Sequence, residues 1–245
     1  KLFSLDMDQL YIELSMNDCN EKLREMVGDA KEPYRAALRN IGNKLEKTSS
    51  NLLPIHEWVS DNDELLVPLL ACYESLHECG MGVIAEGALK DTIRRVHSFG
   101  VNLLKLDIRQ DSDRHADVFS ELTRYLGLGD YAQWSEEDKQ AFLLRELSSK
   151  RPLIPRNWKP SEDAQEVIDT CDVISRHSQQ SFGIYIISMA REASDVMAVQ
   201  LLLKEAGVSW PMSVAPLFET LDDLNNSPKV MRNLLEIDWY RGYIK

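Results

Sequence analysis

The sequence predicts a mainly helical protein with an α/β part. An all-helical segment over residues 1–98 is followed, over residues 99–245, by part of a (β/α)8 barrel of the TIM type with a helical insertion. Three observations predict this fold. Apolar residues recur at three- and four-residue spacing in the first part, as in amphipathic helices, and the period changes to two near residue 104. Further on, two strand-like stretches flank one helix-like stretch, which makes a parallel βαβ unit.

The first part contains five helix-like stretches. The apolar spacing predicts helices over residues 5–14, 21–27, 33–45, 62–78 and 86–98. Gly28 and Gly100 stand where a helix would end, and Pro33 stands in a favoured first-turn position. The third helix has an apolar stripe of Tyr34, Ala37, Leu38, Ile41 and Leu45.

A first strand is expected in the run LLKLDIRQ, residues 103–110, where apolar and charged residues alternate. In a barrel its leucines would pack outward on helices while its charged residues point inward. Lys105 and Asp107 would then neutralise each other, because unpaired buried charges are costly. Arg109 would be left to face a ligand, and its planar fork suits carboxylate or phosphate oxygens. The alternative for Arg109 is an ion pair with Asp107 or Asp111.

Helices and a second strand occupy residues 114–206. Helices are expected over 114–126, over 136–147 after the cap Ser135, and from the cap Ser161 to about 177. The nearly continuous apolar run 183–190 predicts a buried parallel strand, and Ser194 is expected to cap the next helix. The basic residues Lys150, Arg151 and Arg156 form either an anion site or a solvated face.

The stretch PMSVAPLFETLDD, residues 211–223, predicts a strand that turns directly into a helix. Its first part has the period of two of a strand, and Thr220 with Asp223 matches a capping box. Glu219 is therefore expected at the end of the strand, on the rim where barrels bind substrate, with Leu217 just below it on the same face. The alternative is a solvated loop carboxylate, because rim position alone does not imply function.

Composition limits the partners and the compartment. The 28 Lys and Arg against 40 Asp and Glu give a net charge of −12, so nucleic acid and anionic membrane surfaces are poor partners. No apolar run approaches the ~20 residues that span a bilayer. Four cysteines without metal or redox spacing indicate reduced thiols in a cytoplasmic protein. Because the chain starts without methionine and stops shortly after IDWYRG, it is expected to be a piece of a longer protein.

Several long runs together resemble phosphoenolpyruvate carboxylase of the bacterial type. They extend in order through nearly all of the chain, which makes the resemblance highly specific. The runs are EPYR at 32–35, ACYESLHECGMG at 71–82, LDIRQDSDRH at 106–115, SKRPLIPRNW at 149–158, VAPLFETLDDLNN at 214–226 and IDWYRGYIK at 237–245.

The resemblance implies a largely helical enzyme built on an α/β barrel, an allosteric cytoplasmic homotetramer. The family joins bicarbonate to phosphoenolpyruvate with Mg²⁺ or Mn²⁺, giving phosphate and the oxaloacetate that feeds the tricarboxylic acid cycle. It implies that Glu219 is a metal ligand, that Arg109 contacts the substrate phosphate, and that Leu217 lines the pocket for the substrate's methylene end. Cation and guanidinium would stabilise negative charge at the enolate and at the phosphate.

The resemblance also has gaps. The family's catalytic histidine and its Gly-Tyr-Ser-Asp-Ser strand, which bears a second metal-binding aspartate, have no counterpart in these 245 residues. No histidine of the chain (His56, His77, His97, His115 or His177) lies in the family's histidine motif. The chain alone is therefore expected to be inactive. A different class of function is a non-catalytic α-rich interaction module of the same fold.

Overall fold

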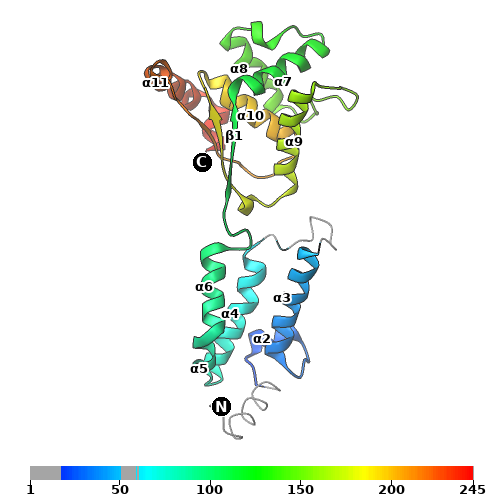
Figure 1. The fold of residues 1–245 in the computed structure, drawn as a ribbon, viewed down its shortest axis with the longest axis vertical. Helices are drawn as coiled ribbons and strands as arrows, with labels where there is room; N and C mark the ends of the chain where they lie inside the picture. The colour runs from blue at the N-terminus through cyan, green and yellow to red at the C-terminus, as the bar shows by residue number, and fades with distance from the viewer. Residues whose placement is uncertain (1–17, 51–58, 60, 245) are drawn as a thin grey trace. The chain divides into compact units, whose positions relative to one another are not determined.

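A computed structural model describes residues 18–50, 59 and 61–244 (Figure 1). The chain forms two compact units, residues 1–104 and residues 105–245. The helix expected over residues 5–14 and the side chain of His56 lie outside the described residues. Within the described part of the chain, no helix is both long enough and apolar enough to cross a membrane.

The first unit consists of helices, as the sequence predicts. Gly28 and Gly100 end two of them with φ of 62° and 59°, a conformation that glycine adopts without steric cost. Pro33 stands in the first turn of another, where its missing N–H leaves no bond unmade. The principal helices are α2 (Glu21–Val27), α3 (Pro33–Ser49), α4 (Asp63–Glu78) and α6 (Lys90–Phe99).

Two details of this unit differ from the sequence expectation. The helix expected from residue 86 begins earlier, with α5 (Gly82–Ile84) and a π-helical turn η2 (Ala85–Leu89) before α6. Gly87 makes the kink inside that turn with φ of −90° and ψ of −130°. The predicted stripe of α3 is also only partly buried, because Leu38 and Leu45 are exposed while Ala37 is not.

The second unit contains a small parallel sheet, as the sequence predicts. Its strands are β1 (Leu106–Asp111), β2 (Phe182–Ser188) and β3 (Val214–Pro216), in the order β1-β2-β3. Both neighbouring pairs are parallel. The described chain is thus mainly helical with one three-stranded parallel sheet.

Helices connect the strands of this sheet. The expected caps Ser135, Ser161 and Thr220 each accept a hydrogen bond from a backbone amide of the first turn. The cap before α10 is Glu192 and not Ser194, because Glu192 and Asp195 form a capping box one turn apart. The helices are α7 (Ser112–Tyr125), α8 (Glu136–Ser148), α9 (Glu162–Arg176), α10 (Ala193–Glu205), α11 (Leu221–Glu236) and α12 (Asp238–Tyr243), with 3-10 turns η3 (Tyr131–Gln133) and η4 (Gln179–Ser181). The sequence reading missed α12.

The two faces of the sheet have different surroundings. Ile108, Tyr185 and Val214 align across the strands and belong to the main hydrophobic core. That core includes most of the residues of α10, and α10 contacts α7, α8 and α9. The next row, Arg109 with its lateral partners on β2 and β3, lies on the opposite face because side chains alternate along a strand. No described helix buries this second face, so it is the open face of the sheet.

The start of β1 corrects one part of the sequence reading. Leu104 and Leu106 are 77% and 62% exposed and do not pack on helices; of the three alternating apolar residues only Ile108 reaches the core. Asp107 makes no ion pair with Lys105 among the described residues. Its carboxylate instead accepts the backbone N–H of Ile184 at 3.1 Å, where the β1–β2 register shifts by one residue.

Candidate functional site at the C-terminal ends of the strands

The three parallel strands end at one edge of the sheet, and the chain turns into α7, α10 and α11 there. In open or closed parallel α/β sheets, ligands bind outside this carboxyl edge, because the loops that follow the strands converge there. All three residues that the sequence singles out lie on β1 or directly after β3. The carboxyl edge is therefore the candidate functional site.

Arg109 lies on β1 within the open face, and its side chain is exposed. Neither carboxylate considered as its partner binds it among the described residues. Asp107 accepts the Ile184 amide, and Asp111 caps α7 by accepting the N–H of Asp113 at 2.8 Å. The guanidinium of Arg109 thus has no ion pair in the described part of the chain and is available to an anion.

Leu217 follows β3 and shows where the sequence reading of the strand is wrong. The ladder hydrogen bonds of β3 end after the Leu217 N–H, which donates to the Ile187 carbonyl at 2.8 Å. The expected strand to Glu219 stops short because β2 turns away at Met189, which has a φ of 55°. Leu217 itself is 36% exposed at the edge of the open face.

Glu219 stands in the turn between β3 and α11, not at the end of the strand. Alternation nevertheless persists, because Phe218 packs on the core while Leu217 and Glu219 are both exposed. Thr220 and Asp223 form the expected capping box, in which hydrogen bonds from the Thr220 hydroxyl and backbone lower the pKa of the Asp223 carboxyl. The turn is thereby fixed, and the Glu219 carboxylate points to solvent without a partner in the described chain.

The three predicted residues share one edge of the sheet but come from different strands. One strand, β2, separates β1 from β3. Two strand spacings place the backbone of Arg109 roughly 10 Å from the β3 line that leads to Leu217 and Glu219. A ligand that bridges them would therefore have to span about two strand spacings, and all three side chains are exposed.

Further residues hold this edge together, and sequence reasoning missed them. The Ser112 hydroxyl donates to the Met189 carbonyl at 2.9 Å and joins the start of α7 to the end of β2. The Asn226 amide of α11 donates to the Arg191 carbonyl at 2.9 Å and joins α11 to the loop after β2. These bonds connect residues 77 and 35 positions apart, so no local pattern could have indicated them.

The carboxyl edge offers one carboxylate that suits a hard cation. The described residues contain no group of three or more His, Cys, Asp or Glu side chains placed to hold a metal ion. A cation such as Mg²⁺ often takes only one or two protein carboxylates and completes its shell with water and substrate oxygens. Glu219 fits as one such carboxylate. The four cysteines are free thiols, and two of them, Cys72 and Cys171, are buried.

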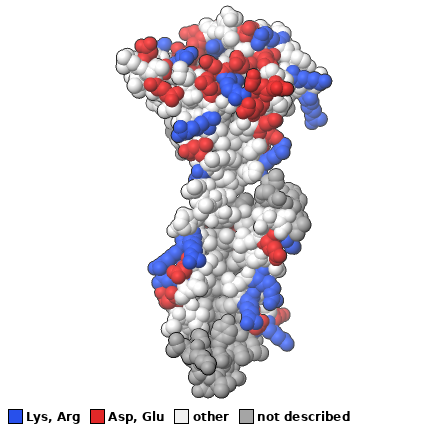
Figure 2. Space-filling view, viewed as in Figure 1, with Lys and Arg blue, Asp and Glu red and all other residues white. Residues whose placement is uncertain are grey.

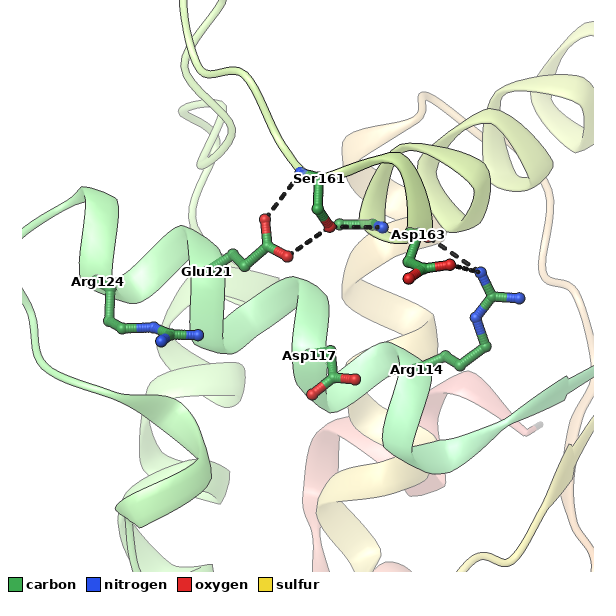
Figure 3. Close-up of a pocket in the computed structure, with 7 residues that line it drawn as sticks. Arg114, Asp117, Glu121, Arg124, Ser161 and Asp163 are labelled. Atoms are coloured by element: carbon green, nitrogen blue, oxygen red, sulfur yellow. Dashed lines mark hydrogen bonds and ion pairs between the residues drawn. The ribbon is translucent and has the colours of Figure 1, made fainter.

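A polar pocket of about 270 Å³ lies between α7 and α9 (Figure 3). Two of its charged side chains, Arg114 and Glu121, bind partners across the two helices. Arg114 donates to Glu166 at 2.9 Å, and Glu121 accepts from both the amide and the hydroxyl of Ser161. Acidic side chains gather over this part of the molecule, where Figure 1 draws α7 and α9 (Figure 2). The pocket is therefore a polar contact between helices and does not compete with the carboxyl edge.

The basic cluster of the loop after α8 is partly engaged as well. Arg151 donates to the buried Glu146 carboxylate at 3.4 Å. The same loop is fixed by Glu205, which accepts the backbone N–H groups of Leu153 and Ile154 at 2.6 and 3.0 Å. This arrangement favours a structural role for Arg151, and the exposed Lys150 and Arg156 remain as a solvated face.

Known proteins of one family match this chain over nearly its whole length. A family model described as phosphoenolpyruvate carboxylase matches residues 4–245. The phosphoenolpyruvate carboxylase of Vibrio atlanticus is 57% identical over 252 residues, covering 100% of this chain and 29% of that protein. Those of Aeromonas salmonicida and Pectobacterium atrosepticum are each 56% identical with the same coverage. The chain thus spans 29% of the length of these curated relatives.

Proposed function

This chain belongs to the phosphoenolpyruvate carboxylase family, and we propose that it forms the phosphate- and metal-binding part of such an enzyme. The whole enzyme would carboxylate phosphoenolpyruvate with bicarbonate to give oxaloacetate and phosphate. The observation that carries the proposal is the common edge of one parallel sheet. There a guanidinium and a carboxylate are both exposed, and neither has an ion pair within the described part of the chain.

In this proposal the three strands are part of a (β/α)8 barrel. The support is the difference between the two faces of the sheet. Helices cover the face of Tyr185 and Ile187, as they cover the outside of a barrel. The open face, which carries Arg109, would be the barrel interior, completed by further strands. The same family membership is our ground for proposing a cytoplasmic homotetramer.

Arg109 would bind and orient the substrate phosphate. Its fork offers two parallel N–H groups to phosphate oxygens, and β1 holds it at a fixed place on the sheet. Transfer of the phosphoryl group to bicarbonate breaks the bond from phosphorus to the enol oxygen and leaves an enolate. A guanidinium on the phosphoryl oxygens would stabilise the charge that accumulates there as this bond breaks.

Leu217 and Glu219 would serve the other end of the substrate. Leu217 gives an apolar wall for the methylene carbon, which helps to exclude the water that would protonate the enolate. Glu219 would hold Mg²⁺ or Mn²⁺, with water and substrate oxygens as the remaining ligands. When bound, such a cation supplies a fixed positive charge for the enolate oxygen.

A non-catalytic interaction module of the same fold is the second candidate. It would need no unpaired charges at the carboxyl edge, and both Arg109 and Glu219 are present, exposed and without an ion pair among the described residues. This observation favours the enzyme.

Manganese binding by the full-length protein that contains this chain tests the proposal. Replacing Glu219 with alanine should weaken Mn²⁺ binding, measured by electron paramagnetic resonance, at least about tenfold, because even an outer-shell partner is worth that much. Asp222→Ala is the matched control, since it removes an exposed carboxylate three residues away and should leave the affinity unchanged. Equal affinities for wild type and Glu219→Ala would contradict the assignment.

The isolated 245-residue chain should form no oxaloacetate from phosphoenolpyruvate and bicarbonate. The reason is that the family's catalytic histidine and its second metal-binding aspartate have no counterpart in these 245 residues. A coupled assay that follows oxaloacetate reduction measures this. Turnover above the blank by the purified chain would show that the 245 residues hold a complete site.

A further inference from the structure

A buried hydrogen-bonded pair lies directly behind Arg109. His115, in the first turns of α7, is 0% exposed, and its Nε2 is 2.9 Å from the hydroxyl of Tyr185 on β2, itself 0% exposed. The two rings are 5.7 Å apart. The residues are 70 positions apart in sequence, so the bond is a tertiary contact between the helix that follows β1 and the strand beside it.

The register of the sheet relates this pair to Arg109. Tyr185 pairs with Ile108 across the β1–β2 ladder, and Arg109 pairs with the next residue of β2. Tyr185 therefore stands one position from Arg109, on the opposite, core-facing side. Because α7 begins at Ser112, immediately after β1, the bond closes a short ring that runs from β1 through α7 and back across β2.

Two further contacts close the same ring at the end of the strands. Ser112 donates to the carbonyl of Met189, a non-glycine residue with a φ of 55°. A left-handed conformation of this kind is costly and persists only where its surroundings impose it. Ser188 lies beside it, with its hydroxyl 3.4 Å from the Gln110 carbonyl. The carboxyl end of β1 is thus held from the helix side and from the neighbouring strand.

The chemistry of the pair suits positioning more than stability. A phenylalanine opposite a leucine would fill a similar volume without desolvating polar atoms, and the Nδ1 of His115 has no partner among the described residues. What the polar pair adds is direction, because a hydrogen bond fixes distance and angle where apolar packing tolerates sliding. Burial also holds the pKa of His115 at about 4, so the ring stays neutral near pH 7.

We propose that His115 and Tyr185 are positioning residues for anion binding, and that their hydrogen bond sets the place of Arg109 at the carboxyl edge. This inference rests on the proposed role of Arg109 with the substrate phosphate. The pair touches neither substrate nor metal. It acts through the backbone of residues 108–111, and its loss loosens the strand that carries the guanidinium.

Steady-state kinetics of the full-length protein that contains this chain test the proposal. Tyr185→Phe removes one hydroxyl and keeps the ring. It should raise KM for phosphoenolpyruvate about five- to tenfold, the effect of losing one buried hydrogen bond, with kcat nearly unchanged. Amide hydrogen exchange of residues 108–111 should become faster. In an Arg109→Ala background the same substitution should have no further effect on KM, because nothing remains to be positioned.

Matched variants separate positioning from loss of stability. Tyr131 is also a buried tyrosine, 2% exposed, but its ring lies among Phe119, Trp134 and Phe142 and its hydroxyl interacts with Ser194 of α10. Tyr131→Phe should therefore leave KM unchanged. His115→Gln offers an amide in place of Nε2 and should have a nearly normal KM. His115→Leu should raise KM as Tyr185→Phe does. If Tyr185→Phe does not fold, His115→Leu takes its place in the test.

Two results would overturn the proposal: an unchanged KM in both Tyr185→Phe and His115→Leu, or an equal rise in KM with and without Arg109. An unchanged KM in Arg109→Ala itself has a different meaning. It would overturn the proposed role of Arg109 in phosphate binding, and with it the positioning role of His115 and Tyr185.

Discussion

The two faces of one small sheet carry different kinds of residues, although both are made from the same strands. Toward the helices stand Tyr185 and Ile187, each 0% exposed. Toward the other side stand Arg109 and Leu217, exposed and without a partner helix among the described residues. The helix-facing side holds the strands in place, and the open side exposes the side chains of Arg109 and Leu217.

The difference between the two faces explains how the charged Arg109 can lie on β1, although the opposite face of this strand packs on the hydrophobic core. An unpaired guanidinium would be very costly in the core, where Ile108 lies. Arg109 is the next residue of β1, and it lies on the open face. The polar groups on the core side belong to His115 and Tyr185, which are buried and share a hydrogen bond. The same alternation that buries Ile108 thus exposes Arg109.

The largest expected effect separates the faces by stability. Ile187→Ala should lower the free energy of unfolding by about 2–5 kcal/mol, because it opens a cavity in a closed core. Ile186→Ala, its neighbour on the open face, should cost much less. Urea titration followed by tryptophan fluorescence measures both, since four of the five tryptophans lie in residues 105–245. Equal costs for the two variants would mean that the faces do not differ as described.

A pH titration sharpens the comparison from the core side. The pKa of His115 is about 4 in the folded protein, chiefly because burial disfavours the charged ring, against 6.5 when solvated. Asp111 raises this pKa and Arg114 lowers it, but both effects are smaller than that of burial. As the pH falls, the unfolded chain therefore binds a proton at His115 before the folded chain does. This titration leaves the free energy of unfolding unchanged above pH 6.5 and lowers it as the pH drops toward 4.

That loss should amount to about 3 kcal/mol and level off below pH 4, where both states are protonated. The measurement is urea denaturation at a series of pH values for wild type and for His115→Gln. Carboxylates titrate in both proteins, so the difference between the two curves isolates the histidine. Parallel curves from pH 7 to pH 4 would show that His115 is not held neutral by burial.

The smallest effect concerns the turn that presents Glu219. Thr220→Ala removes the hydroxyl that caps α11 and should cost about 1 kcal/mol. Thr220→Ser keeps the hydroxyl and should cost little. If the alanine variant unfolds at the same urea concentration as wild type, the capping box does not fix this turn, and the placement of Glu219 needs another explanation.

Local signals in the sequence predicted most helix starts and one strand well. The caps Ser135, Ser161 and Thr220 were found because each acts on residues three positions away. The strand β2 was found because residues 183–190 are nearly continuously apolar, as is typical of a parallel strand. The place of Arg109 on β1 also followed, since alternation is a local property, whereas the pattern left open whether Arg109 pairs with Asp107 or Asp111.

Features that depend on distant residues were not predictable. The end of β3 at Pro216 is set by where β2 turns away, 27 residues earlier at Met189. Asp107 was expected to pair with Lys105, but a backbone amide of β2 binds it instead. The contact of His115 with Tyr185 joins residues 70 positions apart and leaves no pattern in either segment.

The most direct test of the central claim is a double-mutant cycle on phosphoenolpyruvate binding in the presence of Mn²⁺. Calorimetry of the full-length protein would compare wild type, Arg109→Ala, Glu219→Ala and the double variant. If both side chains hold the same small ligand at one edge, the two losses should be non-additive by about 1 kcal/mol or more. Losses that simply add would contradict the account, because they would place the two residues at separate sites.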